Sequence, residues 1–284
     1  MLPKRLLGKT GQYLSIIGFG GILVSGVEQS EADAIVREAI NQGINYFDVA
    51  PSYGDAEEHL GPALEQFRKD VFLACKTTQR KKEGAVDELH ESLRRLRTDH
   101  FDLYQLHGMT TKEDLEQVFA PGGAMEAFIE AREQDLTRYI GFSAHSVETA
   151  LALMDRFDFD TVLFPLNWVN YFNANFGPQV VAKAKNKNMG ILALKTMART
   201  HWAEGQKRTY SKCWYQPVTD PVESELAIRF TLSEPITAAV TPGHSDLFRR
   251  AVEVAENFKP LSDSERTELR KRAEGLKPIF QLRE

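Results

Sequence analysis

The chain has 284 residues, 42% of them hydrophobic, and a formal net charge of −5 at pH 7. This composition provides a large core for one domain but no basic surface for nucleic acid, and no apolar run approaches the roughly 20 residues of a membrane span. Because the sequence has only two cysteines and no signal peptide in its first residues, we expect a protein of the reducing cytoplasm.

The N-terminal segment and the strands after it can be placed from the apolar pattern. Residues 4–13, centred on Gly8-Lys9-Thr10-Gly11, resemble a β-hairpin that could close one end of a barrel. Strand-like runs then recur about every 30 residues, and several are apolar throughout, as in parallel strands buried on both faces. The expected strands are Ser15–Phe19, Asn45–Val49, Val71–Lys76, Phe101–Leu106, Tyr139–Phe142, Thr161–Phe164, Gly190–Leu194 and Ile236–Val240.

Helical periodicity separates these strands. Apolar residues recur at three- and four-residue steps, for example over residues 86–96, and Ser30 and Ser146 are candidate N-caps. A last helix is expected over residues 263–276. Repeated strand–helix units without a linker favour a closed barrel over an open sheet. We therefore assign residues 1–284 to one α/β domain, a (β/α)8 TIM barrel with an N-terminal β-hairpin and a C-terminal helix.

A glycine-rich turn follows the first barrel strand. The turn Gly18-Phe19-Gly20-Gly21 contains Gly-x-Gly, but position 23 is Leu, and no acidic residue follows at the strand end that a dinucleotide fingerprint requires. We interpret these glycines as a tight turn that lines a pocket at the carboxyl ends of the strands.

A long segment between Met197 and Pro221 departs from the regular alternation. A loop of this length in a compact domain is usually functional or mobile. Its aromatic and sulfur-containing side chains either anchor the loop or contact a ligand, and both interpretations stay open here. These residues are His201, Trp202, Cys213, Trp214 and Tyr215.

Four polar residues, Asp48, Tyr53, Lys76 and His107, each follow a strand-like run. In a barrel the carboxyl ends of the strands form the functional face, so these side chains can converge on one pocket. Singly, each has an ordinary explanation as a turn residue, a surface cation or a core histidine. Together, at the ends of three successive strands, they indicate catalysis.

The chemistry of this set suits proton donation to a carbonyl oxygen. A free phenol, with a pKa of about 10, is a weak acid near neutral pH, so we expect Lys76 to lower the pKa of Tyr53. An isolated buried ammonium is costly, which makes Asp48 its expected counter-ion. His107 can donate a hydrogen bond to the carbonyl oxygen. The four residues would then polarise C=O and protonate the alkoxide as a hydride reaches the carbon.

The motifs around these residues resemble the aldo-keto reductase family over nearly the whole chain. The resemblance implies a (β/α)8 barrel that reduces small aldehydes or ketones reversibly with NADPH, with Tyr53 as general acid and Asp48, Lys76 and His107 assisting. We expect a monomer or a weak homo-oligomer. The motifs are Phe47-Asp48-Val49-Ala50-Pro51-Ser52-Tyr53-Gly54, Glu58-His59-Leu60-Gly61-Pro62-Ala63-Leu64, Leu103-Tyr104-Gln105-Leu106-His107 and Ile140-Gly141-Phe142-Ser143.

The resemblance also implies contacts to the nicotinamide. The family holds the carboxamide with a Ser-Asn pair after strand five and a glutamine at strand six; here Ser143 remains, Ala144 replaces the asparagine, and Asn167 occupies the approximate glutamine position. Alanine has no side-chain hydrogen bond to offer, so either His145 takes over the contact or it is an ordinary loop histidine. Further candidates around the ring are Gly21, Ile22, Asp48, Leu194 and Lys195, with Leu194 replacing the tyrosine that many relatives stack on it.

After strand eight the family binds the adenosine 2′-phosphate, and the matching stretch is residues 241–250. A turn into a helix N-terminus offers N–H groups to an anion, and arginines can add charge-assisted bonds. Candidate contacts are Gly243, Ser245, Arg249 and Arg250, although Asp246 adds an opposing charge nearby. We therefore expect NADPH, with NADH the less favoured cofactor.

Substrate contacts are expected from the strand–helix loops, and the candidate residues are Ile22, Leu23, Trp168, Tyr171 and Trp202. One alternative function is a nicotinamide-nucleotide-binding regulatory or accessory subunit with little turnover, which the altered carboxamide residues motivate. Another, a metal-dependent barrel hydrolase, would need clustered histidine ligands, and the sequence contains no such motif. No metal is therefore expected.

Overall fold

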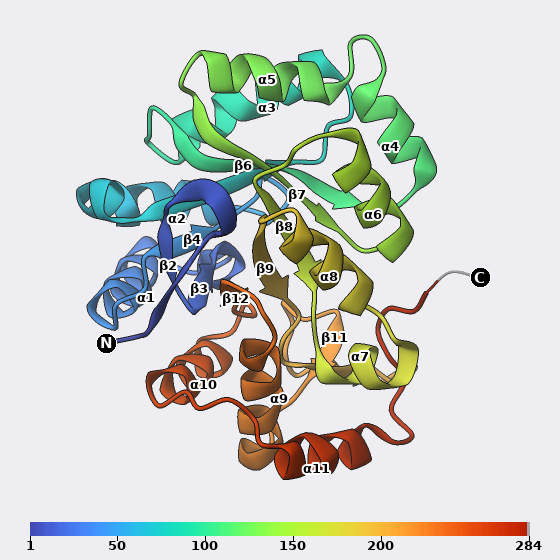
Figure 1. Cartoon of the computed structure of the whole chain (residues 1–284). Coiled ribbons are helices and arrows are strands. Elements are labelled where there is room, and N and C mark those ends of the chain that lie inside the picture. The colour runs from blue at the N-terminus through green and yellow to red at the C-terminus, as the bar shows by residue number, and fades with distance from the viewer. Residues whose placement is uncertain (283–284) are drawn as a thin grey trace.

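The computed structural model describes residues 1–282. Eight parallel strands close into a barrel in the order β12-β3-β4-β5-β6-β7-β8-β9, surrounded by helices (Figure 1). Each predicted strand overlaps one barrel strand, so the predicted (β/α)8 barrel is confirmed. The strands are β3 (Ile17–Gly20), β4 (Tyr46–Asp48), β5 (Phe72–Thr77), β6 (Phe101–Met109), β7 (Thr137–Ala144), β8 (Thr161–Pro165), β9 (Gly190–Leu194) and β12 (Ala238–Val240).

The helices pack apolar faces against the outside of the barrel. They are α1 (Gln29–Asn41), α2 (Ala56–Leu64), α3 (Lys82–Arg95), α4 (Lys112–Phe119), α5 (Ala124–Glu133), α6 (Val147–Arg156), α7 (Trp168–Ala174), α8 (Pro178–Asn186), α9 (Pro221–Ser233), α10 (Ser245–Glu256) and α11 (Asp263–Ala273), with short 3-10 helices at Gly8–Thr10, Gly21–Val24 and Glu65–Asp70. Among residues 1–282, none of the helices combines the length and apolar character needed to span a bilayer.

Two helix N-termini were predicted from single serines, with different outcomes. Ser146 caps α6, because its side chain accepts a hydrogen bond from the Thr149 N–H. Ser30 does not cap α1, because this helix already begins at Gln29 and Glu28 occupies the N-cap position. The predicted C-terminal helix is confirmed as α11, which ends at Ala273, three residues before the predicted end.

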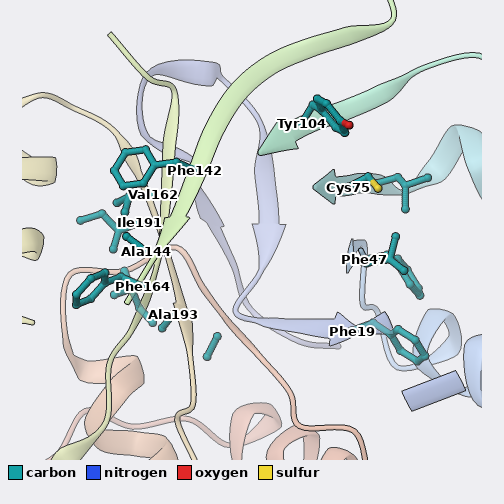
Figure 2. Packing of buried hydrophobic residues seen from close by; sticks show 14 of the residues in the cluster. Phe19, Phe47, Cys75, Tyr104, Phe142, Ala144, Val162, Phe164, Ile191 and Ala193 are labelled. Atoms are coloured by element: carbon teal, nitrogen blue, oxygen red, sulfur yellow. The ribbon is translucent and has the colours of Figure 1, made fainter. Parts of the chain in front are cut away.

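Side chains along each strand alternate between the helix layer and the barrel axis. Phe47 and Cys75, on the helix side, belong to the large core cluster between sheet and helices (Figure 2). The next residues along the same strands, Asp48 and Lys76, therefore face the axis. This alternation places the polar side chains at the carboxyl ends of β4 and β5 inside the barrel.

The N-terminal hairpin closes the opposite end of the barrel, as predicted. Its strands β1 (Lys4–Leu6) and β2 (Tyr13–Ser15) pair antiparallel, and its connection carries Leu7 into the barrel. Leu7 and Leu14 are buried against axial side chains of the barrel strands, namely Tyr46, Phe72, Ala74, Leu103, Leu163, Leu192 and Ala238. The barrel is thus sealed by apolar packing at its amino-terminal end, and its polar end is the other one.

The segment between Met197 and Pro221 is more ordered than an irregular loop. It contains an antiparallel pair, β10 (Ala198–His201) and β11 (Tyr215–Pro217), which we call the arm together with residues 202–214 between the strands. The arm is tied together because the Trp202 indole N–H donates to the Cys213 carbonyl at 2.9 Å. Cys213 is buried in the core, so part of the arm has the anchoring role considered above.

The residues after α11, which we call the tail (277–282), run back beside α7 (Figure 1). The N–H groups of Ile279 and Phe280 both donate to the Asn170 side-chain oxygen, at 3.0 and 3.4 Å. The tail also reaches the carboxyl end of the barrel, where Phe280 contacts His145 and where the sequence predicted contacts mainly from strand–helix loops.

Candidate active site

A cavity of about 310 Å³ opens at the carboxyl ends of the strands. Its only acidic lining residue among the described residues is Asp48, and its walls combine strand ends, the arm and the turn before α10. The lining residues are Gly20, Ile22, Asp48, Tyr53, Lys76, His107, Ser143, His145, Leu163, Leu194, Lys195, Lys212, Trp214, Tyr215, Val240, Thr241, Pro242 and Gly243. The structure thus brings all four predicted catalytic residues into one cavity.

Lys76 and Asp48 form an ion pair inside the barrel. Both side chains are essentially inaccessible to solvent, and the ammonium contacts Asp48 Oδ1 directly. Lys76 also donates to the Val49 carbonyl at 3.1 Å. Burial alone would lower the pKa of Lys76, but Asp48 together with Tyr53 and Cys75 outweighs this effect, so the pKa is raised and the amine stays charged.

Two neutral donors support the other oxygen of Asp48. The Tyr46 hydroxyl donates to Asp48 Oδ2 at 3.1 Å, and Gln105 Nε2 donates to the same atom at 3.2 Å. Tyr46 lies two residues before Asp48 on β4, and Gln105 lies on β6, beyond β5 in the barrel. Their hydrogen bonds fix the carboxylate so that one oxygen remains for Lys76, a supporting role that the sequence analysis did not assign.

Tyr53 lies on the turn between β4 and α2, where its N–H donates to the Ala50 carbonyl at 3.0 Å. The Lys76 ammonium lies 5.2 Å from the centre of the Tyr53 ring. The expected net lowering of the phenol pKa is nevertheless wrong. Burial raises the pKa of Tyr53 above 10, the charge and hydrogen bond of Lys76 oppose this rise, and the Asp48 charge adds to it. Lys76 thus limits the rise without reversing it.

His107 packs edge-on against Tyr53, with ring centres 5.8 Å apart. Burial, together with the positive charge of Lys76, lowers the pKa of His107 to about 3, so the imidazole is neutral at physiological pH. Its Nδ1 lies 3.4 Å from the Ser52 hydroxyl. If that hydroxyl is the donor, the Nε2–H is left to donate a hydrogen bond to another group.

Most of the residues predicted to hold the nicotinamide line the cavity, namely Ile22, Asp48, Ser143, His145, Leu194 and Lys195. The Ser143 hydroxyl already accepts a hydrogen bond from the Gly108 N–H at 2.9 Å, which leaves its own O–H to donate. The His145 ring stacks on Phe280 of the tail with centres 5.1 Å apart. Ala144 is fully buried in the helix-side core, so its methyl group contributes packing rather than ligand contact.

Asn167, predicted near the carboxamide, does not line the cavity. It is the N-cap of α7, and its Oδ1 accepts from the Asn170 N–H at 2.9 Å. Four residues earlier, Leu163 is the β8 side chain that reaches the cavity. The approximate alignment with the family's glutamine therefore does not hold at Asn167, because this side chain caps the helix that follows β8.

The glycine-rich turn lies at one edge of the cavity. Gly20 and Ile22 line it, whereas Gly21 packs against Val49, where an added Cβ would lie 2.8 Å from the valine side chain. Gly243 lines the cavity and is equally crowded, since a Cβ there would lie 2.8 Å from Ile22. These glycines let the two turns approach each other closely.

The predicted phosphate-binding residues lie at and beyond this edge. Ser245 is the first residue of α10, whose N-cap His244 makes no side-chain capping hydrogen bond. Neither arginine lines the cavity: Arg249 forms two hydrogen bonds with Glu38, at 2.8 and 2.9 Å, and Arg250 donates to the Pro221 carbonyl at 2.6 Å. The Arg249–Glu38 pair is largely exposed, so breaking it costs little.

The chemistry of these residues fits a nicotinamide nucleotide. The uncapped N-terminus of α10 can accept an anionic group, and Lys195 and Lys212 add positive charge to the cavity wall. Leu163 and Leu194 provide apolar surface for a planar ring beside the catalytic residues. The cavity wall thus carries positive charge at several points and apolar surface between them.

The sequence analysis missed several cavity residues. Lys212, whose ammonium donates to the Leu23 carbonyl at 2.9 Å, comes from the arm and carries no motif. For Trp214 and Tyr215, anchoring of the loop and contact with a ligand had both been left open, and both residues line the cavity. The only available signal was the density of aromatic residues in the arm.

Of the five proposed substrate contacts, only Ile22 lines the cavity. Trp168 is fully buried and Tyr171 partly buried in a core cluster between α7, α9 and α11. Leu23 is also buried in the core. Within residues 1–282, no group of three or more His, Cys, Asp or Glu residues is placed to hold a metal ion.

Comparison with known proteins extends these observations. The aldo/keto reductase family model matches residues 16–270. The chain is 35% identical over 157 residues to the uncharacterized oxidoreductase YqkF of Bacillus subtilis, covering 50% of this chain and 49% of that protein. It is 29% identical over 213 residues to L-galactose dehydrogenase of Arabidopsis thaliana, covering 69% and 66%. The chain thus matches about half to two thirds of the length of these relatives.

Solved structures show the same fold over nearly the whole chain. The holo form of an aldo-keto reductase from Bacillus halodurans has a TM-score of 0.77 at 23% identity and covers 98% of this chain and 99% of that one. An aldo-keto reductase from Klebsiella pneumoniae in complex with NADPH has a TM-score of 0.75 at 20% identity and covers 100% and 99%. At these identities the likeness is evidence for fold alone.

The buried ion pair predicts strong coupling between its partners. Lys76→Met should destabilise the protein by about 3–5 kcal/mol, because Asp48 then becomes a buried carboxylate with only neutral donors. Adding Asp48→Asn removes that charge, so the double variant should be more stable than the sum of the single losses implies. Urea unfolding of the wild type, Lys76→Met, Asp48→Asn and the double variant measures this coupling. If the two single losses of unfolding free energy simply added in the double variant, the pairing would be contradicted.

Proposed function

The chain belongs to the aldo-keto reductase family, and from this we propose that it reduces aldehydes or ketones to alcohols with NADPH. Tyr53 is the general acid, and Lys76, Asp48 and His107 assist it. The observation that carries this proposal is the convergence of the phenol, the buried ion pair and the neutral imidazole in one cavity.

Each residue has a defined task in this reaction. The nicotinamide of NADPH, when bound, supplies the hydride. Tyr53 donates its proton to the carbonyl oxygen, and Lys76 stabilises the phenolate that remains. Asp48 keeps Lys76 charged and in place. Neutral His107 donates a hydrogen bond that polarises and orients the carbonyl, and it is not itself the proton source.

The cofactor would span the cavity from its catalytic end to α10. Ser143 and His145, which line the cavity, would contact the carboxamide, and Leu163 and Leu194 would contact the ring. The N-terminus of α10 would hold the 2′-phosphate through its backbone N–H groups, with Arg249 released from Glu38 to add charge. Asp246 in the same turn disfavours the phosphate, so the preference for NADPH depends on the arginine.

Tyr53→Phe should lower kcat for a generic aromatic aldehyde by about 10²–10⁴-fold, because the phenol is the group assigned to protonate the carbonyl oxygen. Affinity for NADPH should change little, which fluorescence titration can establish. Tyr13→Phe, on the exposed face of the N-terminal hairpin, is the matched control and should keep wild-type activity.

If the Tyr53→Phe variant kept the wild-type kcat, Tyr53 would not be the general acid. A different result, stoichiometric NADPH binding by the wild type without turnover across a broad carbonyl panel, would favour the accessory-subunit alternative.

The pKa shifts predict a flat pH profile for the reduction of a neutral aldehyde. The pKa values of His107 and His145 are lowered to about 3 and 4, so both are already neutral at pH 5. The pKa of Tyr53 is raised, so the phenol keeps its proton far above neutral pH. We expect a constant kcat from about pH 5 to 8 and a fall only as the pH passes the pKa of Tyr53. An ionisation near pH 6.5 would show that a histidine donates the proton.

Cofactor choice predicts a selective effect of Arg249. Arg249→Met should weaken NADPH binding by about tenfold while leaving NADH binding unchanged, since only NADPH carries the 2′-phosphate. Arg94→Met, which removes a similarly exposed Arg–Glu pair on α3, is the control. Titrations with both nucleotides measure the effect, and equal wild-type affinities for the two would argue against an NADPH enzyme.

A further inference from the structure

Lys195 is a cation in the cavity wall without an anionic partner. It directly follows the last residue of β9 and lines the cavity. Among residues 1–282, the ionisable groups that act on its amine are Cys213 and Lys76, and no carboxylate is among them. Most cations of the chain that are this well enclosed have such a partner, as Lys76 does.

The backbone holds Lys195 in an uncommon conformation. Its φ is +66°, in the left-handed region that non-glycine residues seldom adopt. Its carbonyl accepts the Ala198 N–H at 2.8 Å, which closes the turn into β10. Strained residues of this kind tend to cluster at functional sites.

Two aromatic rings of the arm hold the Lys195 ammonium. It lies 5.5 Å from the centre of the Trp214 ring and 5.1 Å from the centre of the Tyr215 ring. Cation–π contacts of this length attract the ammonium but supply no negative charge. Burial, followed by the positive charge of Lys76, lowers the pKa of Lys195 to about 8, so the amine is still mostly charged at neutral pH.

The charges around Lys195 leave the catalytic end of the cavity positive. Asp48 neutralises Lys76, and the two histidines are uncharged at neutral pH. Lys195 lowers the pKa of both histidines, so it lies within electrostatic reach of His107, which would contact the carbonyl, and of His145 beside it. Lys212, by contrast, contacts Leu23 and lies beside His244 at the α10 edge.

We propose that Lys195 binds an anionic group of the substrate, so that the preferred substrates are aldehydes or ketones that carry a carboxylate. This inference rests on the proposed function, because it names the substrate class of the same cavity. A carboxylate would form a charge-assisted hydrogen bond with the ammonium and replace the missing counter-ion. A neutral carbonyl compound would leave the ammonium unpaired and should be discriminated against.

The test compares acids with their esters as substrates. Kinetics with NADPH are measured for 3- and 4-carboxybenzaldehyde and for their methyl esters, in the wild type, Lys195→Met and Lys195→Arg. For at least one acid we expect the wild-type kcat/KM to exceed that of its ester by about 10–100-fold. Lys195→Met should lose at least tenfold more on the acid than on the ester, mainly through KM, and Lys195→Arg should recover most of the preference.

Lys207→Met is the matched control, because Lys207 is an exposed lysine on the same arm and should not alter the acid-to-ester ratio. An unchanged ratio in Lys195→Met would overturn the inference. Equal losses on acid and ester, together with weaker NADPH binding in a fluorescence titration, would also overturn it, because the anion that Lys195 holds would then be a phosphate of the cofactor.

A binding measurement separates this inference from the proposed function. Calorimetric titration with benzoate, with and without NADP⁺, requires no turnover. If the wild type reduces no aldehyde but binds benzoate at least tenfold more tightly than Lys195→Met does, the proposed function fails and the anion site stands. Equal or absent benzoate binding in both proteins would overturn the anion site.

Discussion

The structure of the site depends on one buried ion pair, Lys76 with Asp48. Moving these two charges into the barrel is costly, and their mutual attraction offsets that cost only when the remaining hydrogen-bonding capacity is satisfied. Tyr46 and Gln105 supply two donors to Asp48, and the Val49 carbonyl accepts from Lys76. Three neighbouring strands of the barrel, β4, β5 and β6, must therefore be in register for the pair to exist. The ammonium of this pair limits the rise in the pKa of Tyr53, and its charge adds to the burial that keeps His107 neutral.

The fold and the four catalytic candidates could be predicted because the apolar pattern of the strands indicates both where the strands lie and which polar residues follow them. Phe47 and Cys75 belong to apolar runs that are typical of buried strands, and both side chains face the helices. The polar residues that follow them, Asp48 and Lys76, therefore face the other side of the sheet. A lone Lys76 after five apolar residues can face only the barrel axis or a helix, and an isolated charge under a helix has no partner. Local pattern and tertiary position therefore agree at these residues.

Other features depend on tertiary contacts that no local pattern encodes. Asn167 has the polarity of a ligand contact, yet it serves as a helix N-cap, and nothing in its immediate sequence separates these roles. The arm closes through an indole–carbonyl hydrogen bond between residues 202 and 213, and the tail is held by Asn170, 109 residues away from Ile279. The pKa of Tyr53 was predicted in the wrong direction because burial outweighs the neighbouring charge, and burial is a property of the whole fold.

At Lys195, with its left-handed backbone, the residue that would make the protein most stable differs from the residue that would recognise a charged ligand. Glycine or asparagine would adopt the same φ of +66° with less strain, so either would relax the turn after β9. Neither could place a positive charge between the rings of Trp214 and Tyr215. A lineage evolving toward thermal tolerance would thus find an easy stabilising substitution at this position, and a variant that accepted it would exchange recognition of charged molecules for a sturdier scaffold.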